Sequence, residues 1–501
     1  MTVRMILRFA FRRWFRVVAL GGLCGGLVSV SVAATYHVDG ADGDDAADGK
    51  SPVTAWRSLA RVNTHVFVPG DELRFKAGTH FAGQLAPRGS GSAEQPIRVG
   101  VYGDGARPRI DGGGRVRDAV LLRNVEFWEV TGLEVTNLGE RREPWRTGVR
   151  VVSDGFGKMR HIQLRDLLVR DVNGDLRKER EGCGIYFESR GGKGSHFDGL
   201  LIEGCRVVRT DRNGICQRTS SRARSVGVVI RGNVLEDIGG DGIKLWGSNG
   251  GLIERNVIRG GRMRCEDYAA GIWPFDSDDT LIQFNEVSGM RGTKDGQGFD
   301  ADYRCRRSVF QFNYSHHNEG GFMLICSPGN SYNEGTIVRY NVSRNDGINS
   351  ARVFHLSGSQ DTLIHNNTIY VGPNQKLPLV LCTDWDGGRP TRLRFVNNVF
   401  HVDGTVTYEL QPSQDLVFEN NLYFGDHRGR PHDASAVTNR PPWVHVPSGG
   451  EGFASLAGWK LQALPEFMHG RPIKTTAPHD FFGQPLATNR APALGAAEFV
   501  E

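Results

Sequence analysis

Several protein classes are disfavoured by what the sequence lacks. The 501 residues include eight cysteines, but none of them stand in the closely spaced pairs of a zinc site. Seven remain once Cys24 leaves with an N-terminal export signal, so at least one is unpaired or bonded to another molecule. We therefore expect cysteine to act here mainly as a small buried residue.

A retained membrane anchor and a nucleic-acid partner are also disfavoured. Residues 1–34 have the organisation of a signal peptide, with an arginine-rich start, a short glycine-containing apolar core at Val17–Val32 and a cleavage site at Val32–Ala34. This segment holds five arginines and no acid, so its removal takes the net charge from +5 to zero. We expect a periplasmic or secreted monomer that is free of the membrane after cleavage and does not bind nucleic acid.

The sequence is rich in glycine, with 66 residues, and it repeats a short phrase that begins with glycine. Each copy continues with a large apolar residue, and five of the six copies precede a segment rich in β-branched residues that contains an Asn. The copies are GIYFES (Gly184–Ser189), GICQRT (Gly214–Thr219), GIKLWG (Gly242–Gly247), GIWPFD (Gly271–Asp276), GFDADY (Gly298–Tyr303) and GFMLIC (Gly321–Cys326). The asparagines are Asn233, Asn256, Asn285, Asn313, Asn341, Asn367, Asn398 and Asn421.

The spacing of these asparagines indicates a solenoid. Successive positions lie 23 to 31 residues apart, a period typical of coils that each cover the apolar face of a neighbour. The segments are too short and too often interrupted by Gly to be helices, so the fold is expected to be all-β. The asparagines are expected to stack and to hydrogen-bond along the axis of the coil.

The chain is expected to divide into four parts. These are a signal peptide (1–34), an N-terminal cap with the first rungs (35–118), the regular coil (119–424) and a closing C-terminal cap (425–501). In the N-terminal cap, Glu72–Lys76 and Ile97–Tyr102 are expected to be strands. A helix over Ala55–Val66, capped by Thr54, would cover the open end of the stack.

The chain resembles a known group of enzymes in several short motifs. These are Tyr36-His37-Val38-Asp39, Ala55-Trp56, Pro69-Gly70-Asp71 and the ending Gly495-Ala496-Ala497-Glu498. Together with the coil pattern, they are similar to motifs of the secreted right-handed parallel β-helix enzymes that act on polysaccharides. The resemblance implies a right-handed parallel β-helix solenoid with an N-terminal cap and a C-terminal closing segment, and a polysaccharide or oligosaccharide substrate. Because these are scaffold motifs, they identify the fold better than the reaction.

Alternation along a strand divides each phrase into an inward and an outward set. The second and fourth residues are mostly apolar and are expected to face the core, Phe322 and Leu324 in the last copy among them. The third and fifth residues should then form one outward strip, about 24 Å long at roughly 4.8 Å per rung. Its aromatic and charged members are the expected sugar contacts: Tyr186, Glu188, Arg218, Trp246, Trp273 and Phe275.

Two carboxylates on this strip, Asp300 and Asp302, are the leading catalytic candidates. They lie on the same strand face, about 7 Å apart at Cβ. That spacing suits the acid and base of an inverting glycosidase or, if the side chains lean together, a pair that includes a nucleophile. Like charges crowded together raise one another's pKa, which keeps one carboxyl protonated at neutral pH.

Further acids stand at the corners that enter the rungs. Asp241, Asp295 and Glu319 are expected to tune the pair or to replace one member, although an Asp at such a corner also commonly caps a turn. His316 follows the strand of Asn313, and we expect it to reach the neighbouring edge as a substrate contact. A solvated turn is the plainer interpretation of His316.

Three functions fit these residues. The leading hypothesis is a secreted glycoside hydrolase that uses the paired carboxylates and requires no cofactor and no metal. The second is a polysaccharide lyase that acts on a uronate-containing polymer. The third is a carbohydrate-binding solenoid without catalysis, which accounts for the aromatic strip but not for the acids beside it.

The lyase hypothesis depends on Lys244. Gly242-Ile243-Lys244-Leu245 is similar to the Gly-Phe-Lys-Leu strand that carries the base lysine in one pectate lyase family, where calcium neutralises the uronate. The resemblance implies that Lys244 abstracts the proton, and Asp295, Asp300 and Asp302 are the alternative candidates for holding calcium. The sequence departs from that family at Cys216, where the family has a calcium-binding Asp.

Overall fold

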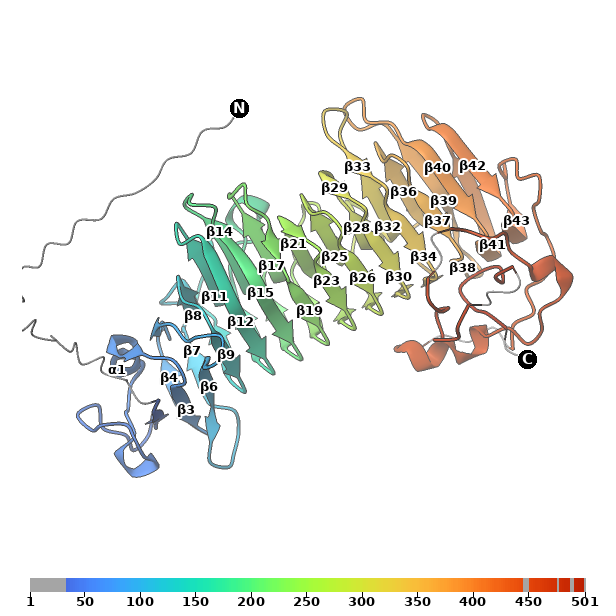
Figure 1. The fold of residues 1–501 in the computed structure, drawn as a ribbon. Coiled ribbons are helices and arrows are strands. Elements are labelled where there is room, and N and C mark those ends of the chain that lie inside the picture. The colour runs from blue at the N-terminus through green and yellow to red at the C-terminus, as the bar shows by residue number, and fades with distance from the viewer. Residues whose placement is uncertain (1–32, 445–449, 475–476, 487–490, 500–501) are drawn as a thin grey trace, which may run out of the picture. The chain divides into compact units, whose positions relative to one another are not determined.

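The fold is a parallel coil of short strands, seen in a computed structural model that describes residues 33–444, 450–474, 477–486 and 491–499. Strands stack in chain order along one axis (Figure 1), and each pairs in parallel with the strand one coil later. The predicted all-β parallel β-helix is confirmed. The predicted signal peptide lies outside the described residues except for its last two positions. Among the described helices, none is long and apolar enough to cross a membrane.

Three faces of parallel strands run the length of the coil. The first face is one continuous sheet, and the predicted strands Glu72–Lys76 and Ile97–Tyr102 are two of its members. Its strands are β1 (Thr35–Val38), β3 (Glu72–Lys76), β6 (Ile97–Tyr102), β9 (Trp128–Thr131), β12 (Lys158–Arg165), β15 (His196–Glu203), β19 (Val229–Arg231), β23 (Leu252–Glu254), β26 (Leu281–Gln283), β30 (Val309–Gln311), β34 (Ile337–Arg339), β37 (Leu363–His365), β40 (Thr391–Val396) and β42 (Gln414–Glu419). Two short strands, β18 (Ser225–Val226) and β22 (Ser248–Asn249), extend it sideways.

The second face begins directly after each stacked asparagine. Its strands contain both buried and partly exposed side chains at Val234–Ile238 and Val257–Arg259, but they are buried throughout at Glu286–Ser288, Tyr314–His316 and Val342–Arg344. They are β4 (His80–Ala82), β7 (Arg109–Asp111), β10 (Glu134–Asn137), β13 (Leu168–Val172), β16 (Arg206–Thr210), β20 (Val234–Ile238), β24 (Val257–Arg259), β27 (Glu286–Ser288), β31 (Tyr314–His316), β35 (Val342–Arg344), β38 (Thr368–Val371), β41 (Val399–Glu409) and β43 (Leu422–His427).

The third face carries the Gly-led phrases. Its strands are buried on both sides in the middle of the coil, at Ile272–Phe275, Gln297–Ala301 and Gly321–Cys326. They are β8 (Asp118–Arg123), β11 (Thr147–Asp154), β14 (Cys183–Arg190), β17 (Asn213–Thr219), β21 (Ile243–Trp246), β25 (Ile272–Phe275), β28 (Gln297–Ala301), β32 (Gly321–Cys326), β36 (Phe354–Ser357) and β39 (Lys376–Thr383). The long strand β41 joins this face to the second.

Short elements cover the ends and edges of the coil. The predicted N-terminal helix is shorter than expected: α1 spans Leu59–Thr64 and is capped by Ser58, because Thr54 closes a 3-10 turn, η1 (Pro52–Thr54), instead. The other 3-10 turns are η2 (Lys178–Arg180), η3 (Phe453–Trp459) and η4 (Glu466–Met468), and the remaining strands pair as β2 (Val66–Phe67) with β5 (Arg88–Gly89) and β29 (Cys305–Arg306) with β33 (Asn333–Glu334).

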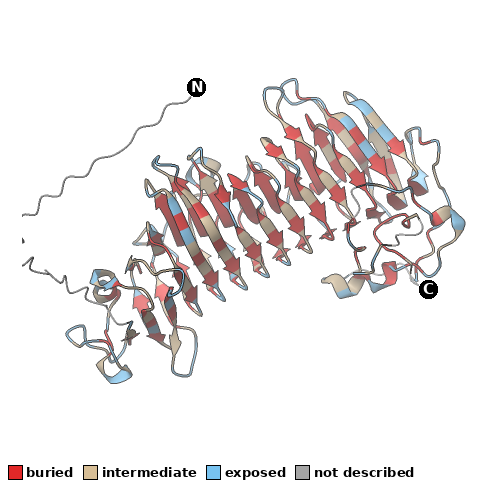
Figure 2. Cartoon of the chain, viewed as in Figure 1, coloured by how far each residue is buried: buried red, intermediate tan, exposed pale blue. Residues whose placement is uncertain are grey.

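The interior is held by apolar side chains and by an asparagine ladder. Figure 2 shows the strands of the coil mostly buried, and their inward residues form one continuous hydrophobic cluster. Asn233 donates from its backbone and its side chain to Oδ1 of Asn256, at 3.0 and 2.9 Å. The same pair of bonds recurs up to Asn421, which donates to Asp433. The predicted structural role of the asparagines is confirmed.

The C-terminal segment packs along the second face. Trp443, Leu456 and Trp459 form a separate hydrophobic cluster with Tyr314 and Tyr370 of that face. The segment therefore covers the second face, and it leaves the outer side of the third face to be covered by that face's own loops.

One copy of the repeated phrase has the opposite orientation to the one predicted. Met323 and Ile325 point into the core and pair with Phe299 and Ala301, whereas Leu324 points outward. Phe322 and Met323 both donate their backbone N–H to the carbonyl of Val353. Because two successive residues share one acceptor, the strand register of this copy shifts by one residue. A slip of one residue exchanges the two faces of a strand. As a result, Cys326 rather than Ile325 faces the carboxylates.

Candidate active site

The outward side chains of the third face stand in two columns, as predicted. Strand register places Tyr186, Cys216, Lys244, Trp273 and Asp300 in the first column. The second column contains Glu188, Arg218, Trp246, Phe275 and Asp302. The two columns together form one surface, the wall, as the sequence predicted. The carboxylates of Asp300 and Asp302 lie on this wall beside the rung that carries Trp273 and Phe275.

The expectation that this wall projects freely into solvent was wrong for the whole first column and for Phe275, which are buried. Lys244, Trp273 and Asp300 are only 4 %, 6 % and 4 % exposed. The loop that carries η2 lies over the wall: its Lys178 Nζ stands 5.6 Å from the Trp273 ring centroid, and Glu181 contacts Lys244. The wall is therefore more deeply covered than predicted.

Lys244 is an ion-pair member and not a free amine. Its Nζ donates to Glu181 Oε2 at 2.8 Å, and Glu181 is itself fully buried. Burial by itself lowers the pKa of Lys244, but the negative groups around it, Glu181 among them, outweigh burial and raise that pKa above its usual value. A lysine that keeps its proton cannot act as the general base of β-elimination.

The two central carboxylates lean together. Oxygen atoms of Asp300 and Asp302 lie within 4.8 Å of each other and of Cys326 Sγ. The thiol of Cys326 lies 3.3 Å from Asp302 Oδ1 and 3.9 Å from Asp300 Oδ1. Tyr303 donates its backbone N–H to the same Asp302 oxygen at 2.8 Å. Both of these contacts fall on Oδ1 of Asp302, and the hydrogen bonds of the described residues include none to its Oδ2.

Burial makes the carboxyl groups of Asp300 and Asp302 weaker acids than usual. It raises the pKa of Asp302 to about 6, against the opposing effects of the Tyr303 N–H and of Lys178. Burial also raises the pKa of Asp300 well above its usual value, and the charges of Asp302 and Asp295 add to this effect. Asp300 is therefore neutral when Asp302 is ionised, which is how closely packed carboxyls divide one charge.

Asp295 is the third carboxyl of this group. It is half-buried, and burial raises its pKa, whereas Lys178 and Arg352 oppose that rise. Arg352 donates to the carbonyls of Thr293 at 3.0 Å and of Asp295 at 3.4 Å, so it fixes the corner that carries the carboxyl. Asp295 and Asp302 are the two partly exposed acids of the group, and Asp300 lies beneath them.

The other two predicted acids have structural partners. Asp241 is fully buried: its Oδ1 accepts the backbone N–H of Ala270 at 3.0 Å and the indole N–H of Trp273 at 3.1 Å, and Arg212 lies 3.4 Å from Oδ2. Glu319 accepts the backbone N–H of Gly292. Asp241 therefore positions the Trp273 ring of the wall, and Glu319 closes a turn.

Aromatic rings continue from the wall to the carboxylates. The Trp246 and Phe275 rings meet edge-on at 4.9 Å between centroids, and Phe275 meets Tyr303 at 4.6 Å. Arg218 lies over the Trp246 ring at 5.4 Å. Arg218 and Trp246 are half-buried, so both are accessible where a sugar would lie against the wall.

Tyr186 and Glu188 lie at the far end of the wall. Tyr186 is fully buried with Arg150 over its ring at 5.0 Å, and Arg150 also pairs with Glu188 and Asp118. These residues make an ion-pair network several rungs before the acids. Nothing in their contacts connects them to Asp302.

His316 lies on the second face, in β31. Its Nε2 is 3.1 Å from Glu286 Oε1, and its ring stacks on Tyr314. A cavity of about 420 Å³ beside it is lined by Ser288, Gly289, His316, His317, Arg344, Gly450 and Glu451. The structure therefore does not bring His316 to the acids of the third face.

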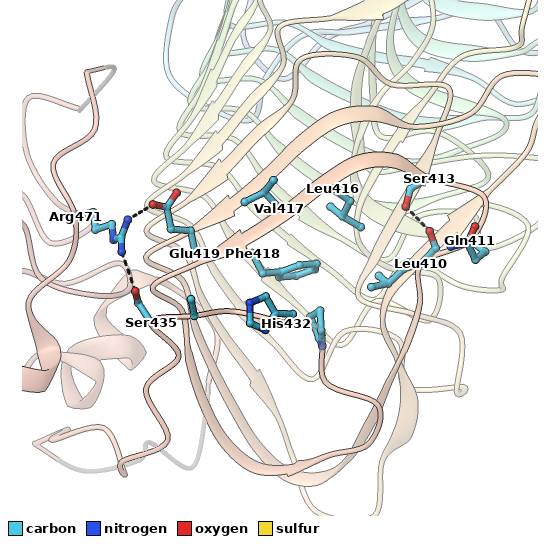
Figure 3. Close-up of a pocket in the computed structure, with 12 residues that line it drawn as sticks. Leu410, Gln411, Ser413, Leu416, Val417, Phe418, Glu419, His432, Ser435 and Arg471 are labelled. Carbon is cyan, nitrogen blue, oxygen red and sulfur yellow. Dashed lines mark hydrogen bonds and ion pairs between the residues drawn. The ribbon is translucent and has the colours of Figure 1, made fainter.

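A larger cavity, of about 640 Å³, lies at the C-terminal end of the first face (Figure 3). Its lining is largely apolar, and its ionisable residues are Glu419, His432 and Arg471. Arg471 pairs with Glu419 and donates to Ser435 Oγ at 2.8 Å. Because this lining has no second carboxylate to pair with Glu419, the cavity does not suit glycoside hydrolysis.

Sequence reasoning missed three groups at the site: Lys178, Cys326 and Tyr303. Lys178 lies in the charged stretch Arg177–Glu181, and such a stretch usually forms a solvated loop. Cys326 reaches the site only because its strand, β32, is slipped by one residue, and Tyr303 lies beyond the end of β28. The seven described cysteines are all buried and free, as expected for small buried residues, and only Cys326 contacts the carboxylates.

Two carboxylates and a thiol are also a possible set of metal ligands. Calcium takes oxygen ligands, six to eight in number. The sulfur of Cys326 and the shortage of further oxygens at this point fit calcium poorly, so no step is assigned to a metal.

The fold corresponds to a known class. The family described as right handed beta helix region matches residues 183–369. The structure of XylC in complex with xylose shares the fold, with a TM-score of 0.54 at 11 % identity over 93 % of this chain and 98 % of that one. The expected resemblance to right-handed β-helix proteins of carbohydrate metabolism is confirmed.

Within that class, the chain is similar to lacto-N-biosidases. It is 27 % identical to the lacto-N-biosidase of Bifidobacterium longum subsp. longum over 82 % of this chain. The chain spans about a third (32 %) of the length of that protein. The crystal structure of the GH136 lacto-N-biosidase from Eubacterium ramulus superposes with a TM-score of 0.62, at 26 % identity over 77 % of this chain and 68 % of that one.

Proposed function

We propose that this protein is a glycoside hydrolase of the lacto-N-biosidase type, with an oligosaccharide as its substrate. The observation that carries the proposal is the group of Asp295, Asp300 and Asp302, whose pKa values are all raised, on a wall of aromatic side chains. The similarity to lacto-N-biosidases supports the same reaction class.

Asp302 is assigned as the nucleophile. Tyr303 and Cys326 hold its Oδ1, which fixes the plane of the carboxylate and leaves Oδ2 to attack the anomeric carbon. The glycosidic bond then breaks, and a covalent glycosyl–enzyme forms with Asp302. Hydrogen bonds to the charged form also limit the rise in pKa that burial causes.

Asp295 is assigned as the acid that protonates the departing oxygen. It is partly exposed and has a raised pKa, as an acid that works near neutrality must have. In the second step it removes a proton from the water that releases the sugar. Asp300 stays beneath the pair and is neutral while Asp302 is charged.

The reaction class can be tested with purified protein and three kinds of substrate. Nitrophenyl lacto-N-bioside and an oligosaccharide with a terminal lacto-N-biosyl unit should be hydrolysed, and a uronate-containing polysaccharide should yield no unsaturated ends. Unsaturated ends that absorb near 230 nm would instead identify a lyase, and binding without turnover of any substrate would identify a binding protein.

The two roles are separated by the leaving group. Asp295→Asn should lose about 10²- to 10⁴-fold with the oligosaccharide, but much less with a nitrophenyl glycoside, because nitrophenolate leaves without a proton. Asp302→Asn should lose both activities equally. Similar losses for the two variants on both substrates would overturn this division of roles.

The proposed enzyme uses no metal and no cofactor. Dialysis against EDTA should leave the rate of hydrolysis unchanged, and added calcium should not raise it. A loss of activity that calcium restores would show that an ion belongs to the site.

A further inference from the structure

A line of aromatic rings leads from the catalytic carboxylate to the surface. Tyr303, which follows Asp302 and donates its N–H to it, packs edge-on against Phe275 at 4.6 Å between ring centroids. On the other side, Tyr303 meets the ring of Trp385 at 5.6 Å. Trp385 thus lies next to the site, although it is 82 residues further along the chain.

Trp385 differs from the other rings of this line in its exposure. Trp273 and Phe275 are 6 % and 8 % exposed, whereas Trp385 is 38 % exposed. An exposed indole leaves a large apolar surface in water, which is unfavourable unless a ligand covers it. The pyranose rings of a sugar substrate have apolar faces that suit such a surface.

The loop that carries Trp385 is tightly held. Trp385 and Gly388 exchange both backbone hydrogen bonds, at 3.1 and 2.8 Å, and Gly329 donates to the carbonyl of Trp385 at 3.1 Å. Asp384 accepts from the backbone of Gly387 at 2.7 Å and from Arg389 Nε at 2.8 Å.

Close packing adds to these bonds. A Cβ at Gly388 would lie 2.2 Å from the carbonyl oxygen of Ser327, so only glycine fits there. The backbone at Trp385 is therefore fixed against the loop after β32. Pre-organisation of this kind reduces the ordering cost of binding a ligand.

We propose that Trp385 is a sugar-stacking residue that binds the sugar ring adjacent to the unit held by Asp302 and Asp295, and that it sets the preference for an oligosaccharide over a single sugar. The inference rests on the proposed function for the position of the cleaved unit. Trp246 and Trp385 then lie on opposite sides of the carboxylates in strand order, and the substrate extends along the wall between them.

The test uses a variant that does not turn over, so that binding is measured without catalysis. Asp302→Asn is compared with Asp302→Asn/Trp385→Ala by calorimetric titration of an oligosaccharide with a terminal lacto-N-biosyl unit. Loss of the indole should weaken binding about tenfold, as expected for an aromatic stacking contact. Trp385→Phe, which keeps a smaller ring, should lie between the two.

Phe156 provides the matched control. It has the same 38 % exposure as Trp385 and lies on the loop between β11 and β12. Phe156→Ala in the Asp302→Asn background should bind the oligosaccharide normally. Binding that is unaffected by Trp385→Ala, or weakened equally by Phe156→Ala, would overturn the proposal.

Failure of this inference and failure of the proposed function give different results. If the wild-type protein hydrolyses the oligosaccharide but Trp385→Ala neither weakens binding nor raises KM, the stacking proposal is wrong and the hydrolase stands. If no substrate is hydrolysed but Trp385→Ala still weakens binding tenfold, the stacking residue stands and the enzyme assignment is wrong.

Discussion

Replacement of Lys244 by Met separates the hydrolase from the lyase most informatively. The variant removes the ammonium group but keeps most of the apolar stem. It leaves the carboxylate of Glu181, which is fully buried, without its 2.8 Å partner. A buried charge that loses its partner commonly destabilises a protein by about 3–5 kcal/mol.

Two contacts that Glu181 keeps in the variant place the expected loss of stability at the lower end of that range. Asn213 still donates to Glu181 Oε2 at 3.0 Å, and Arg218 Nη1 lies 3.6 Å from Oε1. We therefore expect Lys244→Met to lower the free energy of unfolding by about 3 kcal/mol. In the double variant with Glu181→Gln, no buried charge is left unpaired, and at least half of this loss should be recovered.

The assay is urea unfolding followed by circular dichroism, alongside turnover well below the unfolding midpoint. Lys376→Met is the control, because Lys376 is exposed on β39 of the same face, and it should change neither stability nor activity. The folded Lys244→Met protein should keep most of its kcat. A variant of normal stability with no turnover would show that Lys244 is the catalytic base, and would refute the account.

Four further predictions follow from the same contacts. Because burial raises the pKa of Asp302 to about 6, the nucleophile is protonated below that pH, and kcat/KM should fall as pH drops through 6; a rate independent of pH from 4 to 7 would contradict its role. Cys326→Ala removes a donor to Asp302, so the acidic limb of the pH profile should move to higher pH and kcat should fall, whereas Cys326→Ser and the buried control Cys382→Ala should shift it little. Asn285→Ala leaves donors of Asn256 unpaired and should lower stability by about 2–4 kcal/mol in urea unfolding, whereas exposed Asn249→Ala should not. Asp300→Asn keeps a neutral side chain where a neutral carboxyl stood, so its kcat should fall less than tenfold, and a loss as large as that of Asp302→Asn would make Asp300 a catalytic residue.

The coil and its wall were predictable because both depend on periodicity. The asparagine spacing indicates one coil per repeat, and the alternation within each phrase places Lys244, Trp273 and Asp300 on one side of the sheet. Both inferences use only the chain and the geometry of a strand. They needed no knowledge of how the loops fold.

How deeply the side chains of the wall are buried was not predictable, because their burial depends on the loops that cover them. Lys178 and Glu181 belong to a charged stretch that suggests a solvated loop, yet Glu181 is fully buried against Lys244. The pairing joins residues 63 positions apart, and no local pattern signals it. The same is true of Trp385, which lies outside the repeated phrase and reaches the site only through its ring contact with Tyr303.

The identity of the working acids was predictable only as a group. Asp295, Asp300 and Asp302 were all candidates, but the sequence favoured Asp300 and Asp302 because they share one face of a predicted strand. The exposure of the side chains changes this ranking of the candidates, since Asp300 is buried whereas Asp295 and Asp302 are partly exposed. The one-residue slip at Phe322 and Met323, which brings Cys326 to Asp302, depends on a backbone bond to Val353 that the phrase does not reveal.

The role of Asp302 is tested most directly by the turnover of nitrophenyl lacto-N-bioside by Asp302→Asn, measured with and without added azide. We expect a fall in kcat of at least about a thousandfold in a protein that unfolds like the wild type, and formation of a glycosyl azide when azide takes the place of the missing carboxylate. A folded Asp302→Asn protein that hydrolyses this substrate at the wild-type rate would contradict the account.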